Sequence, residues 1–185
     1  VQVRLIPTPG RLMALLQLAI PIEAQSTLSA IPEGAAGVRA TLDAMIRAAN
    51  SASITLQIRD LAESIIQAVP DKDYAGQINA IQRWVKTHIR YVRDPVHAEM
   101  LKTPHALLES PYGDCDDQAT LVAALAQAIG FPARFIAIGM HDPCIFEHVY
   151  AEVRLGTVWV SVETTEPVEI GWQPENVLAR MVRHA

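Results

Sequence analysis

Two stretches in the second half of the chain alternate apolar and polar residues, as half-buried β-strands do. The first runs from Phe146 to Leu155 and the second from Thr157 to Glu163. Their valines fall on one face of each stretch, and polar side chains, among them His148, fall on the other. The pattern predicts two paired strands whose valine faces share one core.

A hairpin between these strands brings a histidine and a carboxylate together. If the chain turns at Leu155-Gly156, His148 lies directly opposite Glu163, with Cβ atoms about 5 Å apart. A hydrogen bond at that distance would orient the imidazole and stabilise its charged form. A turn centred one residue later puts Thr165 opposite His148 instead.

Helical spacing dominates the rest of the chain. The clearest apolar stripe follows Cys115 and ends at Gly130, and it comprises Val122, Leu125, Ala126 and Ile129. Earlier stripes predict helices over 38–46 and 58–66, and a third that starts after Asp73 with Trp84 in its buried face. Val1, Val3 and Leu5 predict a short strand, and 31–34 reads as a loop.

Cys115 therefore lies at or near the N-terminus of a helix. The free N–H groups and the helix dipole favour a thiolate there and can also receive an oxyanion, a role expected for the stretch Tyr112, Gly113 and Asp114. Asp114, Asp116 and Asp117 act in the opposite direction, because neighbouring carboxylates raise the pKa of a thiol. A histidinium partner is then needed to keep Cys115 ionised at neutral pH.

Size and charge restrict the classes of protein. The chain has 185 residues, half of them hydrophobic, and a net charge of −5, which fits one domain over 1–185 and argues against nucleic acid as a partner. No apolar run reaches the length of a membrane span. We expect a cytoplasmic protein, or a periplasmic or secreted one if Leu12–Ile20 belongs to a targeting segment.

Three groups of residues resemble the transglutaminase-like superfamily of cysteine enzymes. They are Gly113-Asp114-Cys115-Asp116-Asp117-Gln118-Ala119, His148-Val149-Tyr150-Ala151-Glu152-Val153 and Trp159-Val160-Ser161-Val162-Glu163-Thr164-Thr165. The resemblance implies an α+β, papain-like core over about 71–172, in which the helix of the catalytic cysteine packs on an antiparallel sheet. Residues 1–70 would form a strand and accessory helices.

The resemblance also implies a Cys-His-Asp triad, carried onto Cys115, His148 and Glu163. The chain departs from the family at the third position, where Asp followed by Pro-Thr is usual and Glu163-Thr164-Thr165 stands here. The Gly-Asp-Cys-Asp-Asp motif most resembles that of bacterial transglutaminase-like cysteine proteases and that of family members encoded among phage and prophage structural genes.

Two functions follow from the resemblance. The first is a cysteine protease or amidase, or a crosslinking transglutaminase, that acts on protein or peptide substrates, with hydrolysis favoured. The second is an assembly protein, of a phage particle for example, that keeps the fold with a weak or idle triad. The departure at Glu163 and the three aspartates beside Cys115 support this second interpretation as the alternative, and the enzyme is the preferred one.

The remaining candidate ligands and nucleophiles are expected to be incidental. Cys144 is expected to be structural or incidental, since two cysteines make no disulfide framework, although a pair with Cys115 is conceivable in an oxidising compartment. His105 and His141 fall in loops, where surface roles are the default. Hard oxygen ligands at Asp114, Asp116 and Asp117 suit Ca²⁺, but capping of the helix is the preferred role, so no cofactor is expected. The oligomeric state is left open.

Overall fold

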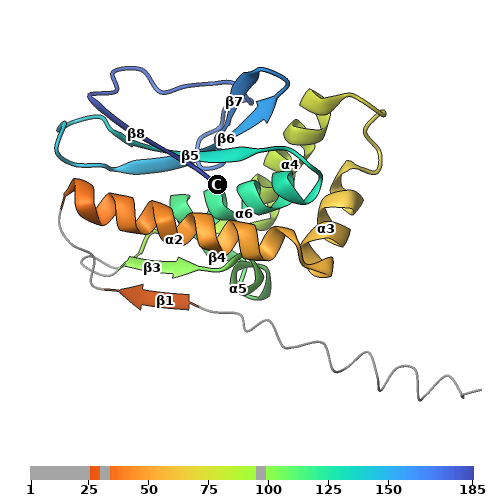
Figure 1. Cartoon of the computed structure of the whole chain (residues 1–185), viewed down its shortest axis with the longest axis horizontal. Coiled ribbons are helices and arrows are strands. Elements are labelled where there is room, and N and C mark those ends of the chain that lie inside the picture. Colours follow the sequence, from red (N-terminus) through yellow and green to blue (C-terminus); the bar gives the residue numbers. More distant parts are fainter. Residues whose placement is uncertain (1–25, 30–33, 95–98) are drawn as a thin grey trace, which may run out of the picture.

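The computed structural model describes residues 26–29, 34–94 and 99–185. The expected strand at Val1–Leu5 and the Leu12–Ile20 segment lie outside these residues. Within them the protein is α+β, with helices packed against one face of a four-stranded antiparallel sheet (Figure 1).

The four helices indicated by the apolar stripes are all present. They are α2 (Ala35–Ser53), α3 (Leu56–Ile66), α4 (Tyr74–His88) and α6 (Cys115–Ala128). Asp73 caps α4 by accepting from the Gly76 N–H at 2.9 Å. Helix α6 ends before Gly130, whose φ of 92° is a left-handed conformation that favours glycine.

Helix α6 lies at the centre of the molecule and is buried on nearly all sides. The other helices and the sheet surround it (Figure 1). Its Leu121, Val122 and Leu125 are fully buried and belong to the same core as Val149, Val153 and Val162 of the predicted hairpin, whereas Val158 at the turn end is exposed. Trp84 of α4 is only partly buried at the edge of this core, with its ring stacked on His88.

The sheet has the strand order β7-β6-β5-β8. Its strands are β5 (Ala133–Gly139), β6 (His148–Leu155), β7 (Val158–Val162) and β8 (Ala179–His184). The face away from the helices is not simply polar, because Tyr150 of β6 is buried there with Ile136 and Ile138 of β5. Glu152 is also buried on β6, where Arg134 and Arg180 pair with its carboxylate.

The predicted register of the hairpin is wrong by one turn position. The turn falls at Gly156-Thr157, so that Leu155 pairs with Val158 and Ala151 with Val162. Gly156 has a φ of 62°, so the glycine does serve the turn, one step earlier within it than expected. Each residue of β6 consequently faces a residue of β7 that lies two positions later in the sequence than predicted. The prediction of which side chains share a face still holds, because side chains alternate with period two.

Short elements lie on the far side of the helices from the sheet. Strand β1 (Ser26–Ser29) pairs with β3 (Glu99–Lys102), and the two-residue strands β2 (Arg90–Tyr91) and β4 (Tyr112–Gly113) pair in parallel. Helix α5 (Pro104–Glu109) begins after Thr103, whose hydroxyl accepts from the Ala106 N–H at 3.3 Å.

The assignment of His105 to a surface loop is wrong. The residue lies in α5 and is buried, and its Nε2 is 3.2 Å from the Thr55 hydroxyl at the start of α3. A Thr-Pro pair is also a helix-start signal, because the threonine caps and the proline suits the first turn.

None of the helices in the described part of the chain is long and apolar enough to cross a bilayer.

Candidate active site

Cys115 is the first residue of α6, where unpaired backbone N–H groups gather. Asp114 stands at the N-cap position, and its backbone carbonyl accepts from the Gln118 N–H at 3.1 Å. The side chain of Asp114 makes no capping hydrogen bond. The expectation that this carboxylate caps the helix is therefore wrong, although its charge still lies at the positive end of the dipole.

The segment that directly precedes Cys115 is held in place by close backbone packing. Gly113 pairs with Tyr91 across the β2–β4 ladder. A Cβ built on Gly113 would stand 2.4 Å from Oδ2 of Asp117, so only glycine fits between β4 and α6. The position of the cysteine thus depends on the absence of a side chain two residues earlier.

The surroundings of the thiol favour its neutral form. Burial, followed by the charges of Asp116 and Asp114, raises the pKa of Cys115 to about 12. The backbone N–H groups of Val149 and of Cys115 itself point at the sulfur and oppose this rise. The expected effect of the neighbouring carboxylates is present, and burial adds to it.

His148 and Glu163 are joined by a short hydrogen bond. Nε2 of the imidazole lies 2.6 Å from Oε2 of the carboxylate. Glu163 follows the last residue of β7, and its side chain is almost completely buried. Burial alone would raise the pKa of Glu163, but the hydrogen bond and charge of His148, together with Thr165, hold it below its ordinary value.

Both oxygens of Glu163 are occupied, which fixes the plane of the carboxylate. Oε1 accepts from the Thr165 backbone N–H at 2.6 Å and from its hydroxyl at 2.8 Å. The backbone of Glu163 is fixed as well, because Nε2 of the buried Gln82 donates to its carbonyl at 2.7 Å and to that of Val168 at 3.2 Å. Thr165, the alternative neighbour of His148, therefore supports the carboxylate instead of replacing it.

These contacts define which ring nitrogen of His148 is left for chemistry. An ionised carboxylate can only accept, so Nε2 carries the proton that is shared with Glu163. Nδ1 of a neutral ring is then an acceptor. His148 directly precedes Val149 in the sequence, and the backbone N–H of Val149 points at the Cys115 sulfur.

A buried aspartate and lysine connect α6 to the strands before it. Oδ1 of Asp117 accepts from the Lys102 backbone N–H at 2.7 Å, while Nζ of Lys102 donates to the Tyr112 carbonyl and lies 3.6 Å from the centre of the Tyr112 ring. Burial, offset in part by the Lys102 N–H, raises the pKa of Asp117 to about 7. Tyr112 itself is exposed. Sequence reasoning did not identify Gln82, whose partners are distant in the sequence, or Lys102, because no repeat or motif links it to Tyr112 and Asp117.

The aspartates beside Cys115 are close enough to share a cation, and two of them, Asp116 and Asp117, already make hydrogen bonds within the protein. One carboxylate oxygen from each of Asp114, Asp116 and Asp117 lies within 4.8 Å of the others. Oδ1 of Asp116 accepts from the Asp117 N–H at 2.9 Å, and Asp117 holds Lys102. These residues act as a structural junction in the described protein.

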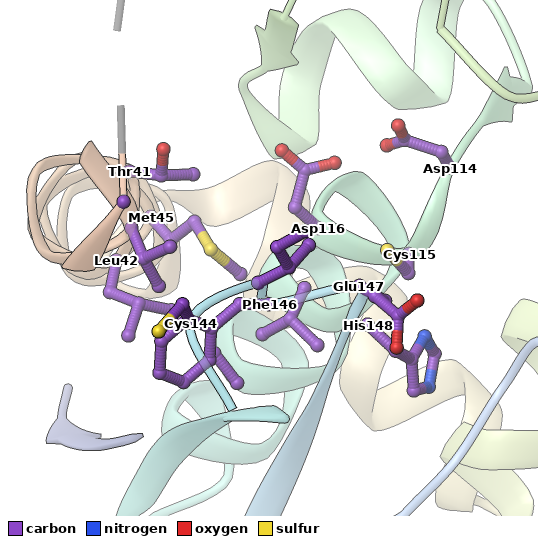
Figure 2. A pocket seen from close by; sticks show the side chains of 15 residues that line it. Thr41, Leu42, Met45, Asp114, Cys115, Asp116, Cys144, Phe146, Glu147 and His148 are labelled. Atoms are coloured by element: carbon purple, nitrogen blue, oxygen red, sulfur yellow. The ribbon is translucent and has the colours of Figure 1, made fainter. Parts of the chain in front are cut away.

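Cys115 and His148 line a cavity of about 430 Å³ between α2 and the loop that precedes β6. Figure 2 shows Cys115 and His148 at one end and the side chains from α2 at the other. The loop is closed on itself, since Glu147 accepts from the N–H groups of Met140 and His141 at 2.9 and 3.1 Å. The cavity gives a substrate access to the thiol side of the site.

The remaining cysteine and the loop histidine lie on this loop. Cys144 is exposed and, like Cys115, is a free thiol. His141 is exposed and its Nδ1 lies 2.9 Å from Oε1 of Glu147. Neither residue contacts the His148–Glu163 pair.

The chain belongs to the transglutaminase-like superfamily, whose family model matches residues 59–164, more than half of the sequence. This match spans Cys115, His148 and Glu163. The papain-like α+β core that the residues indicated is therefore confirmed. No curated protein matches the chain.

Solved structures with a similar fold include three larger proteins. A candidate protease from Parabacteroides distasonis has a TM-score of 0.56 at 13% identity over 69% of this chain. A candidate cysteine protease from Cytophaga hutchinsonii has a TM-score of 0.48 at 22% identity over 60%, and a TGase has 0.40 at 14% over 86%. The chain spans 26%, 38% and 38% of their respective lengths.

Proposed function

We propose that the protein is a cysteine-dependent acyl-transfer enzyme that acts on peptide or carboxamide bonds. The observation that carries the proposal is the 2.6 Å bond between His148 and the buried Glu163, because His148 lines the same cavity as Cys115. A nucleophile, a base and a group that orients the base are the three parts that covalent acyl transfer requires.

The raised pKa of Cys115 defines how the thiol is activated. A thiol with a pKa of about 12 is protonated at neutral pH in the free enzyme. Nδ1 of His148 must then take the thiol proton as the sulfur attacks the carbonyl carbon, so His148 acts as a general base. Glu163 stabilises the imidazolium that forms.

The remaining steps return every group to its starting state. The tetrahedral oxyanion is received by backbone N–H groups at the start of α6, with Tyr112, Gly113 and Asp114 forming the adjoining wall. The imidazolium gives its proton to the departing amine as the C–N bond breaks, which leaves a thioester on Cys115. Water, deprotonated by His148, then attacks the thioester, and the thiol is regenerated with release of the acid.

Hydrolysis is proposed in preference to crosslinking. The motif Gly113–Asp117 resembles that of bacterial cysteine proteases, which supports water as the acceptor. The similar structure from Parabacteroides distasonis is also described as a candidate protease. An amine acceptor would use the same three residues, so the acceptor has to be measured.

An acylation assay tests the proposal without a known substrate. Wild-type protein and Cys115→Ala are incubated with a library of peptides, and mass spectrometry follows cleavage, deamidation and coupling to an added primary amine. We expect products with the wild type and none with Cys115→Ala, at matched thermal stability. Equal, background-level product from both folded proteins would contradict the proposal and favour the assembly protein. The neutral thiol of Cys115 is consistent with that alternative as well.

A further inference from the structure

The cavity beside Cys115 has an apolar wall that the chemistry of the triad does not explain. This wall is formed by α2 and the loop before β6, and its side chains are Val38, Leu42, Met45, Ile145 and Phe146. Leu42 and Met45 are also part of the buried core, so this side of the cavity is fixed. A volume of about 430 Å³ falls within the range of small-ligand sites, about 300–1,000 Å³.

The other lining groups are mainly acidic. Asp114, Asp116 and Glu147 contribute carboxylates, and none of the described lining residues is Lys or Arg. The pKa of Glu147 is lowered by the N–H of Met140 and by His141, so this carboxylate is ionised at neutral pH. An incoming carboxylate would be repelled by these charges, and an uncharged or cationic group would not.

On the basis of the proposed function, we infer that the cavity selects acyl donors whose side chain, at one of the two residues before the attacked carbonyl, is large and apolar, and that it rejects acidic peptides. The apolar side chain lies against α2 and the loop, which leaves the carbonyl at the thiol. This defines a substrate class of peptides with leucine- or phenylalanine-like residues on the acyl side of the bond.

Burial of such a side chain explains why selection should be measurable. A single methylene group in an apolar pocket discriminates by about 10–200-fold in kcat/KM. Leucine exceeds glycine by several such groups, so a preference of about tenfold or more is expected even for a partly open cavity.

Acetyl-dipeptide chloromethyl ketones provide the test, because Cys115 displaces chloride from them and no turnover is needed. Either residue of the dipeptide is varied among Gly, Leu, Phe, Asp and Lys, and peptide mass mapping counts only adducts on Cys115. We expect the Leu and Phe probes to react about tenfold or more faster than the Gly-Gly probe, and the Asp probes to be slowest. Equal rates, or fastest reaction with Gly or Asp, would overturn the inference while labelling of Cys115 leaves the proposed function intact.

Two pairs of variants locate the selection in the cavity. Val38→Trp should bring the Leu rate down to the Gly rate by filling the apolar wall, whereas Ala40→Trp, at an exposed position of the same helix, should not. Glu147→Gln should raise the Asp rate severalfold relative to Leu at low salt, and Glu169→Gln, exposed and outside the lining, should leave the ratio unchanged. Unchanged ratios in Val38→Trp would place the apolar site elsewhere. Failure of every probe to label Cys115 in the folded wild type would instead refute the proposed function.

Discussion

Glu163 reaches His148 diagonally. Continued past its last pair, the β6–β7 ladder would place Glu163 opposite Tyr150, two residues from His148 on the same face, yet Oε2 lies 2.6 Å from the imidazole. Diagonal partners in an antiparallel sheet are about 7–8 Å apart, further than direct neighbours. Glutamate has one methylene group more than the aspartate that is usual in the family, and this extra length lets the carboxylate bridge the longer diagonal separation to His148.

The reach of Glu163 predicts the effect of shortening it. Glu163→Asp should lose the bond to Nε2 and lower the rate at which a chloromethyl ketone alkylates Cys115, by about one to two orders of magnitude. Glu163→Gln keeps the length and removes the charge that stabilises the imidazolium, so a loss of up to about 10⁴-fold is expected. Rates are measured with the fastest chloromethyl ketone, and Glu166→Gln, exposed three residues later, is the control. Wild-type rates in Glu163→Gln would remove Glu163 from the mechanism.

Gln82 is a positioning residue for this contact. Gln82→Leu leaves the Glu163 carbonyl without its buried donor, while the Val168 carbonyl still accepts from Lys86; the loss should cost about 1–3 kcal/mol of stability. It should also lower kcat more than it changes KM, because Glu163 is no longer held against His148. Gln67→Leu, at an exposed position after α3, should change neither quantity. A loss of stability with kcat unchanged would limit Gln82 to a structural role.

The thiol of Cys115 should show the titration of a buried group. Its rate of alkylation by iodoacetamide, separated from that of Cys144 by mass mapping, should keep rising above pH 9, since its pKa is about 12. Asp116→Asn should move the profile to lower pH, because the charge of Asp116 contributes to the rise. A plateau below pH 8.5, the ordinary range of cysteine, would instead indicate a preformed thiolate–imidazolium pair.

Asp117 should make stability depend on pH in the weakly acidic range. The unfolded chain ionises this group near its ordinary pKa of 3.8, whereas the folded protein holds the proton up to about pH 7. Its contribution is complete below about pH 4 and is lost as the pH rises to 7, by about 1.4 kcal/mol per unit of separation.

Asp117→Asn tests this dependence, because the amide oxygen can still accept from Lys102. The free energy of unfolding of this variant should fall less than that of the wild type between pH 4 and 7, as measured by urea denaturation. Asp60→Asn, exposed on α3, serves as the charge-matched control. Parallel curves for the wild type and Asp117→Asn would contradict the assignment.

Helices and strand faces could be predicted because each follows a local repeat. The stripe after Cys115 and the valine alternation in the hairpin predict α6, β6 and β7, although Val158 is exposed and Tyr150 and Glu152 on the opposite face of β6 are buried. Strand β5 was missed because it is buried along almost its whole length and shows no alternation. The two-residue turn was placed one step early because a lone glycine fits either position of it.

The contact between His148 and Glu163 was predictable from the sequence, but the groups that hold it in place were not. His148 and Glu163 lie 15 positions apart on one hairpin, whereas Gln82 and the Glu163 carbonyl are 81 apart and meet only when α4 packs on the sheet. The raised pKa of Cys115 also needed the fold, because burial is its largest cause.

Gly139 shows how the protein separates chemistry from selectivity. A Cβ on this residue would stand 2.2 Å from the Ile145 carbonyl oxygen, so the loop before β6 folds tightly back on the end of β5. With its backbone fixed in this way, the loop can exchange an exposed side chain such as Ile145 with little effect on α6 or the hairpin, whereas Phe146 packs against the core. If the loop selects acyl donors as inferred above, a change of its exposed side chains can alter that selection while Cys115 and His148 stay in place.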